Sequence, residues 1–230
     1  FSDGFYPSGA RTATDVRSPS GALLKAVLLN GTRDIASMPN NNYGWGRIWL
    51  DNNLYFSNVA NHRRLRVWSL PNSVGLATGQ TATYSINVPA GAELRVTLAW
   101  FDPYATLGAA VTLVNNLDLE VVGPGGTYLG NVFSAGGSVT GGTADARNTV
   151  EQVRLTAPTA GVYTITVKGT SVPGNGDAAT NRQGFGLAAS FGNCAGTVAS
   201  APTAPAAGPN PTAGINLSWT GAAGASSYSI

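Results

Sequence analysis

Short segments in which apolar and polar residues alternate recur from about residue 65 onward, and they constrain the fold most strongly. The clearest is 94–101, where every second residue is large and apolar and the positions between hold Arg95, Thr97 and Ala99. Alternation of period two is typical of β-strands, and it predicts that these three residues face water. The sequence therefore predicts a mainly β protein, a jelly-roll-like sandwich of two sheets.

Eight such strands are expected along the chain. They lie near 65–70, 82–88, 94–101, 115–122, 127–131, 150–155, 161–169 and 184–191. The sequence contains 30 glycines and 13 prolines, which favour the many turns that short strands need. The alternation assigns the strands but does not give their order in the sheets.

One helix is expected before the sandwich, over about 19–30. Ser18 is the predicted N-cap, and Gly31 is the predicted left-handed end of the helix. The buried face is expected to hold four apolar residues: Leu23, Leu24, Val27 and Leu28. This N-terminal block has too little apolar surface to fold alone, so it needs a surface to pack on.

Charge and cysteine content exclude several classes of function. Only 10% of the residues are charged, and the net charge is +2 without a run of basic residues. We therefore expect neither a nucleic acid nor an anionic membrane as a partner. Cys194 is the only cysteine, which excludes a disulfide within the chain and a cysteine-based zinc site. The expected state is a monomer.

Six ordered segments carry a resemblance to a known family. They are SPSGALLKAVLLNGTRDI (18–35), PNNNYGWGRIWLDNNLY (39–55), LRVTLAWFDP (94–103), LVNNLDLEVVGPGGTYLGN (113–131), ARNTVEQVRL (146–155) and GVYTITVKG (161–169). The first two are similar to the last long helix and the closing segment of the catalytic domain of subtilisin-like serine proteases. The other four resemble successive strands of the β-barrel that one subgroup of these proteases carries after the catalytic domain.

The resemblance implies four regions. Residues 1–58 would be the C-terminal tail of the catalytic domain, and 59–192 a jelly-roll β-barrel. Residues 193–211 are rich in Pro and Ala and are expected to form a linker. The last region, 212–230, resembles the start of a fibronectin type III module.

The catalytic machinery of this family is missing from the chain. The family uses Asp, His and Ser, with the Ser in a Gly-Thr-Ser-Met-Ala-Thr-Pro motif, and no such motif occurs here. The only histidine is His62, which is expected to be a surface residue at the junction of the two domains. We therefore predict that this chain alone is inactive. The resemblance implies a longer, secreted endopeptidase, with the upstream catalytic domain and protein substrates as partners.

The first candidate metal site consists of Asp102, Asn116 and Asp118. Asp102 follows one predicted strand and Asp118 lies just inside the next, so both can reach one edge of the sandwich. Calcium binds carboxylate, amide and carbonyl oxygens, and the family resemblance favours a structural calcium ion. The alternative is that these residues bond their own backbone at strand ends, as Asp and Asn often do.

A second candidate set consists of Asp145, Asn148 and Glu151. The same oxygen chemistry applies to it, and calcium is again the predicted ion. Arg147 lies among the three and is an alternative counter-charge.

A different class of function stays open: a non-catalytic module that binds glycans or surfaces. Jelly rolls often do so, and Trp45, Trp49 and Trp68 offer aromatic surface for it. Trp100 lies in the inward register of its strand and is predicted to belong to the core. Trp45 is expected to pack against the catalytic domain.

Overall fold

The computed structural model describes residues 1–7, 10–35, 39–49, 52, 63–174 and 181–192, and the backbone of two strands at 203–210 and 214–220. The chain divides into two compact units, Phe1–Asn193 and Cys194–Ile230. His62 and Cys194, on which the sequence makes predictions, lie outside the described residues.

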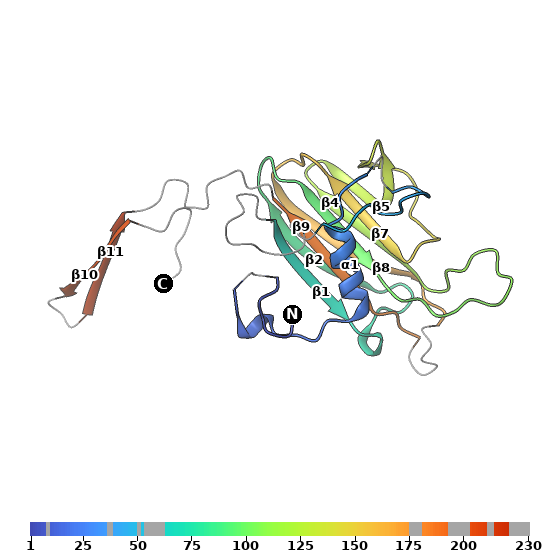
Figure 1. Cartoon of the computed structure of the whole chain (residues 1–230), viewed down its shortest axis with the longest axis horizontal. Helices are drawn as coiled ribbons and strands as arrows, with labels where there is room; N and C mark the ends of the chain where they lie inside the picture. Colours follow the sequence, from blue (N-terminus) through green and yellow to red (C-terminus); the bar gives the residue numbers. More distant parts are fainter. Residues whose placement is uncertain are drawn as a thin grey trace. The chain divides into compact units, whose positions relative to one another are not determined.

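The first unit is a sandwich of two antiparallel sheets (Figure 1). The first sheet, in the order β1-β9-β3-β7, consists of β1 (Arg64–Leu70), β3 (Leu94–Ala99), β7 (Val150–Leu155) and β9 (Phe185–Phe191). The second sheet, in the order β2-β8-β4-β5-β6, consists of β2 (Thr81–Val88), β4 (Asn116–Gly123), β5 (Gly126–Ser134), β6 (Gly137–Thr140) and β8 (Gly161–Ser171). Without the short β6, this is the order of an eight-stranded jelly roll, so the predicted fold class is confirmed.

The main core lies between the two sheets and consists of the apolar residues that alternate along the strands. In β4, for example, Leu117, Leu119 and Val121 are buried, and the residues between them are partly exposed. Trp100 is fully buried at the end of β3, as its register predicts. Within the sandwich, the strand that the sequence does not predict is β6, whose four residues are too few for alternation to be visible.

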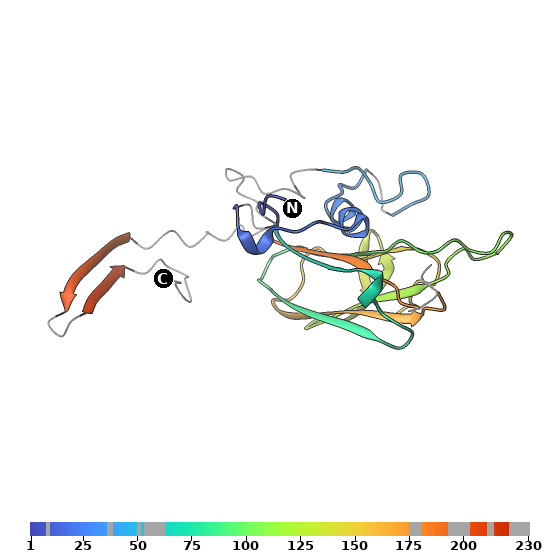
Figure 2. The same ribbon diagram turned by 90° about the horizontal axis from the view of Figure 1, so that it is seen from below.

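A ten-residue helix, α1 (Gly21–Asn30), covers the outer face of the first sheet (Figure 2). It forms a second core with that sheet through Leu23, Ala26 and Val27. The first sheet is therefore buried on both faces, and the prediction that Arg95, Thr97 and Ala99 face water is wrong. Alternation shows two faces of a strand, but it does not show that a separate helix covers one of them.

The details of α1 differ from the sequence predictions. Ser20, and not Ser18, is the N-cap, and its hydroxyl accepts a hydrogen bond from the backbone nitrogen of Leu23 over 3.1 Å. Gly31 has φ −94°, so it is not a left-handed residue. Leu24 and Leu28, predicted to be buried, are 42% and 38% exposed. Within the described ranges, no helix is long and apolar enough to cross a membrane.

The close approach of α1 to the first sheet explains which face of the helix is buried. A Cβ added to Gly186 of β9 would clash with the backbone of Ala22 and Leu23, so strand and helix backbones nearly touch there. Small residues such as Ala22 and Ala26 permit that contact, whereas a face of large leucines would hold the helix farther away. The unit also contains two short 3₁₀ helices, Ala13–Asp15 and Asn72–Val74.

The second unit contains an antiparallel hairpin of β10 (Thr203–Asn210) and β11 (Gly214–Thr220). The pairing runs from Thr203 with Thr220 to Asn210 with Gly214. The second half of the predicted linker is thus a strand. The alternating residues from Ile215 to Trp219 form a strand, as expected. The fibronectin resemblance itself stays a prediction.

Candidate functional site

The largest group of buried polar side chains lies on the outer face of the first sheet, under the C-terminal end of α1. Its main members are Asn30, Arg95, Thr97, Gln152 and Arg154, all nearly inaccessible to solvent. A polar group that loses water costs free energy unless it finds a hydrogen-bond partner. The partners of these side chains therefore show what this surface binds.

Arg95 of β3 binds the end of the helix. Its Nη1 donates to the carbonyl oxygens of Asn30 over 3.1 Å and of Thr32 over 2.6 Å. The last carbonyls of a helix have no partner within the helix, and a positive charge near them is favourable. Arg95 thus supplies, from the barrel, hydrogen-bond donors to the carbonyls at the helix end. In a helix that ends at a left-handed glycine, backbone nitrogens after the helix would supply them.

Asn30 fixes the helix end to two strands at once. Its amide nitrogen lies within hydrogen-bond distance of Arg95 O (3.0 Å), Thr97 Oγ1 (3.1 Å) and Ala188 O (3.1 Å). The first two belong to β3 and the third to β9. A single buried amide therefore fixes the position of α1 across the sheet.

Gln152 and Arg154 of β7 extend the contact. The Gln152 amide nitrogen donates to Thr97 Oγ1 over 2.7 Å and to Leu29 O over 3.3 Å, and its oxygen accepts from Arg154 Nε. Arg154 Nη1 forms an ion pair with Asp34 Oδ1 at 2.7 Å, which binds the segment after the helix. Burial lowers the pKa of Arg154, and the nearby Arg95 lowers it further, while Asp34 opposes both.

Glu93 provides the counter-charge on the barrel side. Its carboxylate pairs with Arg95 Nη2 at 3.0 Å and with Arg63 Nη2 at 2.5 Å. Burial lowers the pKa of Arg63, and Glu93 opposes that shift. Because Glu93 and Asp34 balance the buried cations in part, removing one member leaves another charge unpaired.

We call these eight side chains the helix-end clamp: Asn30, Asp34, Arg63, Glu93, Arg95, Thr97, Gln152 and Arg154. They come from the helix, the segment after it, and three strands or strand ends. Sequence reasoning missed the clamp because it predicted that Arg95 and Thr97 face water, and it predicted no orientation for Gln152 and Arg154. The sequence does contain a signal for the clamp. Arg95 and Thr97 alternate on one strand and Gln152 and Arg154 on another, in a chain with few charged residues. The helix before them needs a surface to pack on.

Asp102, from the first candidate metal set, closes the loop between β3 and β4. Its two carboxylate oxygens accept hydrogen bonds from the backbone nitrogens of Val114 (2.6 Å) and Asn115 (2.7 Å). In the described part of the chain, no hydrogen bond joins Asp102 to Asn116 or Asp118. The structure therefore gives Asp102 a turn-forming role.

Asn116 and Asp118, the other two members, do lie together on β4. The Asn116 amide nitrogen donates to Asp118 Oδ1 over 3.1 Å, and the Thr170 hydroxyl bonds the other carboxylate oxygen. Asn116 Oδ1 is buried and has no hydrogen-bond partner, as expected of an oxygen that could bind a cation. Among the residues described, no three His, Cys, Asp or Glu side chains gather closely enough to hold a metal. Calcium here stays a prediction.

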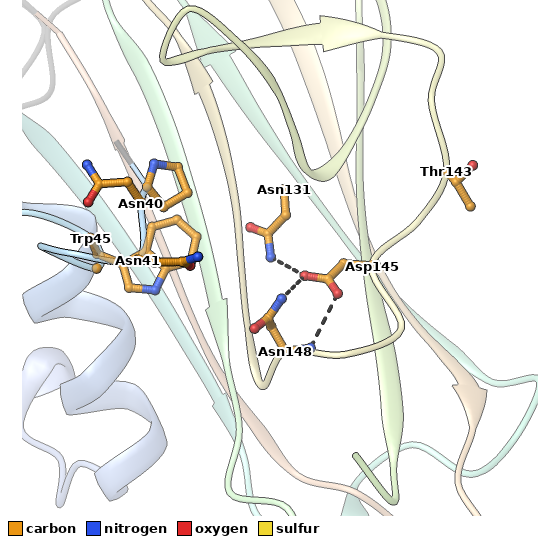
Figure 3. A pocket seen from close by; sticks show the side chains of 9 residues that line it. Asn40, Asn41, Trp45, Asn131, Thr143, Asp145 and Asn148 are labelled. Carbon is orange, nitrogen blue, oxygen red and sulfur yellow. Dashed lines mark hydrogen bonds between the residues drawn. The ribbon is translucent and has the colours of Figure 1, made fainter. Parts of the chain in front are cut away.

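The second candidate set is brought together only in part. Asp145 accepts hydrogen bonds from the amide nitrogens of Asn131 and Asn148, both over 2.6 Å (Figure 3). It also accepts one from the backbone nitrogen of Arg147 over 2.8 Å. These contacts form a turn around the carboxylate. Glu151 is not among its hydrogen-bond partners, and calcium binding by this set also stays a prediction.

Glu151 is fully buried between the two sheets. Its Oε2 accepts a hydrogen bond from the Leu119 backbone nitrogen over 2.7 Å, and its Oε1 has no partner. Burial raises the pKa of Glu151 to about 9, with smaller contributions from the charges of Asp118 and Asp145. The carboxyl group is therefore protonated at neutral pH. It accepts the hydrogen bond from Leu119 of β4 that a neighbouring strand would otherwise accept.

In the described part of the chain, Trp45, Trp68 and Trp100 each pack against other residues of the first unit. Trp100 is in the core, where its indole nitrogen donates to Asn115 O over 3.0 Å. Trp68 stacks on Tyr84 with ring centroids 4.6 Å apart and packs against the core at the sandwich edge. Trp45 contacts Phe133 edge to face at 6.4 Å, so it packs on the barrel.

Comparisons with known proteins find one domain family and relatives that are named as serine proteases. Residues 80–169 match the model of the bacterial pre-peptidase C-terminal domain. The chain is 28% identical over 182 residues to the serine protease/ABC transporter B family protein tagA of Dictyostelium discoideum, covering 75% of this chain and 10% of that protein. It is 29% identical over 201 residues to tagD of the same family and organism, covering 67% of this chain and 11% of that protein.

These matches confirm the resemblance to the C-terminal part of a subtilisin-like protease, and the residues that match the pre-peptidase C-terminal domain lie within the sandwich. The chain spans about a tenth of the length of the curated relatives that it matches. A solved structure, the lysozyme inhibitor PliG of Aeromonas hydrophila, is similar at 17% identity with a TM-score of 0.29, covering 60% of this chain and 93% of that one. That likeness is too low to bear on fold or function.

Proposed function

We propose that this chain is the C-terminal accessory part of a secreted subtilisin-like serine endopeptidase, with the match of residues 80–169 to the pre-peptidase C-terminal domain as the premise. Residues 1–58 are the tail of the catalytic domain, and 59–192 form a barrel that stabilises it. The peptide bonds are cut by the Ser, His and Asp of the upstream part, and protein substrates bind there.

The observation that carries this proposal is the helix-end clamp. Arg95 and Gln152 of the barrel bind the last carbonyls of α1, the helix that resembles the end of the catalytic domain. A flexible tether would leave helix and barrel independent. A buried polar contact instead makes the unfolding of one costly for the other.

The outward face of α1 supports the same proposal. Leu24 and Leu28 are exposed on the helix side that faces away from the sheet, and Ile35 and Ile48 are about half exposed nearby in the chain. Apolar residues on an otherwise well-packed helix favour a further layer of protein over it. The remainder of the catalytic domain is the proposed layer.

Casein hydrolysis tests the proposed class. The longer protein that contains this chain is expected to hydrolyse casein, and replacing its motif Ser by Ala is expected to abolish the activity. The 230-residue chain is expected to show none. Hydrolysis by the chain alone, or a longer protein that is insensitive to the Ser replacement, would contradict the proposal.

A structural calcium ion is part of the proposal. Asn116 and Asp118 offer oxygen ligands on the same strand, because the amide oxygen of Asn116 is unpartnered and its amide nitrogen already contacts the carboxylate of Asp118. Asp102, at the start of the loop between β3 and β4, would have to contribute a further oxygen ligand. Of the second set, Asp145 and Asn148 contact each other through the Asn148 amide nitrogen, and Glu151 is the weakest member because its carboxyl is engaged with Leu119.

A further inference from the structure

A pocket of about 520 Å³ lies between the segment after α1 and the barrel. Figure 3 shows Asn40, Asn41 and Trp45 on one side, and Asn131, Asp145 and Asn148 on the other. The two walls come from parts of the chain about 90 residues apart. The volume falls within the range of about 300–1,000 Å³ that is usual for small-molecule sites.

The barrel wall is held rigidly. Asp145 is surrounded by donors from Asn131, Arg147 and Asn148, so its position is fixed. Asn131 has a positive φ of 62° and bonds the backbone of β7 at Gln152 N (2.9 Å). A wall that is fixed before binding loses little conformational entropy when a ligand arrives.

The opposite wall is also ordered by contacts. Asn40 Oδ1 accepts from the backbone nitrogens of Asn42 and Tyr43, both over 2.9 Å, which closes a tight turn. Trp45 is supported edge to face by Phe133. The aromatic residue at the pocket is therefore fixed by the barrel and not by the turn alone.

The lining chemistry selects against charged and apolar ligands. No lysine, arginine or histidine stands among the described residues that line the pocket, so an anion finds no counter-charge. The one acidic side chain among the described lining residues, Asp145, already accepts hydrogen bonds at both oxygens, which weakens its attraction for a cation. The exposed polar side chains of Asn41 and Thr143 make an apolar ligand unfavourable, because they would lose water without a partner.

An extended peptide is also a poor fit. Peptides commonly add a strand to a free sheet edge. The neighbouring edge of β7 is occupied, because Gln152 N donates to Asn131 Oδ1 and Arg154 N donates to Ser138 Oγ, both over 2.9 Å. The backbone donors that a peptide would need here are already used.

We propose that this pocket binds a neutral saccharide of one or two units. Amide side chains both donate and accept hydrogen bonds, as hydroxyl groups do, so Asn41, Thr143 and Asn148 match a polyol. Trp45 offers an apolar ring against which the C–H face of a sugar packs. This site does not depend on the class of the longer protein, since both walls are present in this chain.

Titration of the isotope-labelled 230-residue chain with saccharides, followed by two-dimensional NMR, tests the site. The probes are glucose, galactose, mannose, N-acetylglucosamine and their disaccharides, with glucuronic acid and triglycine for comparison. Neutral saccharides are expected to shift the backbone amides of 39–45 and 143–148 saturably in the millimolar range or below. Glucuronic acid and triglycine are expected to leave these amides unchanged.

Three variants and one control locate the binding. Asn41→Ala and Thr143→Val, both at exposed positions, are expected to weaken binding about tenfold each, and Trp45→Ala to abolish it. Asn42→Ala is the control, because this exposed side chain lies next to the pocket but does not line it. No shift with any neutral saccharide, or shifts with triglycine alone, would overturn the proposal. Equal weakening by Asn42→Ala would do so as well.

Discussion

A few buried polar side chains decide how the helix sits on the barrel. Arg95 donates to two carbonyls at the end of α1 and pairs with Glu93, while Asn30 reaches β3 and β9 together. Arg95 and Asn30 are buried, so each has lost most of its contact with water. Their hydrogen bonds therefore contribute more to the specificity of packing than to net stability. Removing one partner is costly, because the other group stays buried without a hydrogen bond.

Arg95→Met is expected to lower the free energy of unfolding by about 3 kcal/mol, because two helix carbonyls and Glu93 lose their donor. Urea unfolding of the 230-residue chain measures the change. Arg66→Met, at an exposed position of β1, is the matched control and is expected to change stability by less than about 0.5 kcal/mol. Equal effects of the two variants would show that the clamp is energetically unimportant.

Glu151 predicts a pH dependence of stability. Its pKa is raised from 4.5 to about 9 in the folded protein, so the folded state holds a proton that the unfolded state releases. The stability that this group contributes is therefore complete below about pH 4.5 and is lost progressively as the pH rises to about 9. Glu151→Gln keeps the acceptor for Leu119 and does not titrate.

Thermal unfolding between pH 5 and 9, with a chelator present so that no cation replaces the proton, checks this prediction. The Gln variant is expected to gain stability relative to the wild type as the pH rises. Parallel curves for the two proteins would mean that Glu151 has an ordinary pKa.

At the scale of elements, the contact of α1 with β9 brings two backbones together. Gly186 lies directly beneath the helix backbone at Ala22 and Leu23, and no side chain fits between them. The helix therefore cannot rotate to bury Leu24 and Leu28 without moving away from the strand.

Gly186→Ala is expected to displace α1 and to destabilise the chain by about 3 kcal/mol, since the added methyl group clashes with backbone atoms. Hydrogen exchange of the helix amides, with urea unfolding, measures both effects. Gly174→Ala is the control, because nothing lies within 4 Å of the added Cβ. Unchanged protection of the amides of residues 21–30 in the Gly186→Ala variant would contradict the described contact.

The elements were predictable from the sequence to different degrees. Period-two alternation indicated the eight main strands, because each has one face in the core between the sheets. It could not show that α1 covers the other face of β3, because helix and strand are about 65 residues apart. The helix itself was predictable, but its buried face depends on Gly186, which only the folded structure brings beneath it.

The candidate metal residues were also predictable only in part. Their position at strand ends was predictable, and Asn116 with Asp118 are indeed adjacent. The sequence could not show that Asp102 is engaged by Val114 and Asn115, since this depends on the path of the loop. The saccharide pocket was not predictable either, because its two walls meet only after α1 has docked.

For the whole molecule, removal of calcium tests the proposed structural ion. A chelator is expected to lower the melting temperature of the 230-residue chain, because an ion that binds only the folded state stabilises it by about 2.7 kcal/mol at a hundredfold excess over Kd. Asp118→Asn is expected to remove most of this effect, and Asp15→Asn, far along the chain, to leave it unchanged. A melting temperature that is independent of the chelator would refute the calcium proposal.

The central claim is that the barrel stabilises a catalytic domain through α1. The most direct measurement is the heat inactivation of casein hydrolysis in the longer protein, compared between wild type, Gly186→Ala and Gly174→Ala. We expect Gly186→Ala to lose activity at a lower temperature, in parallel with the unfolding of its barrel, while Gly174→Ala behaves as the wild type. Activity that survives heating unchanged after the Gly186→Ala barrel has unfolded would contradict the claim.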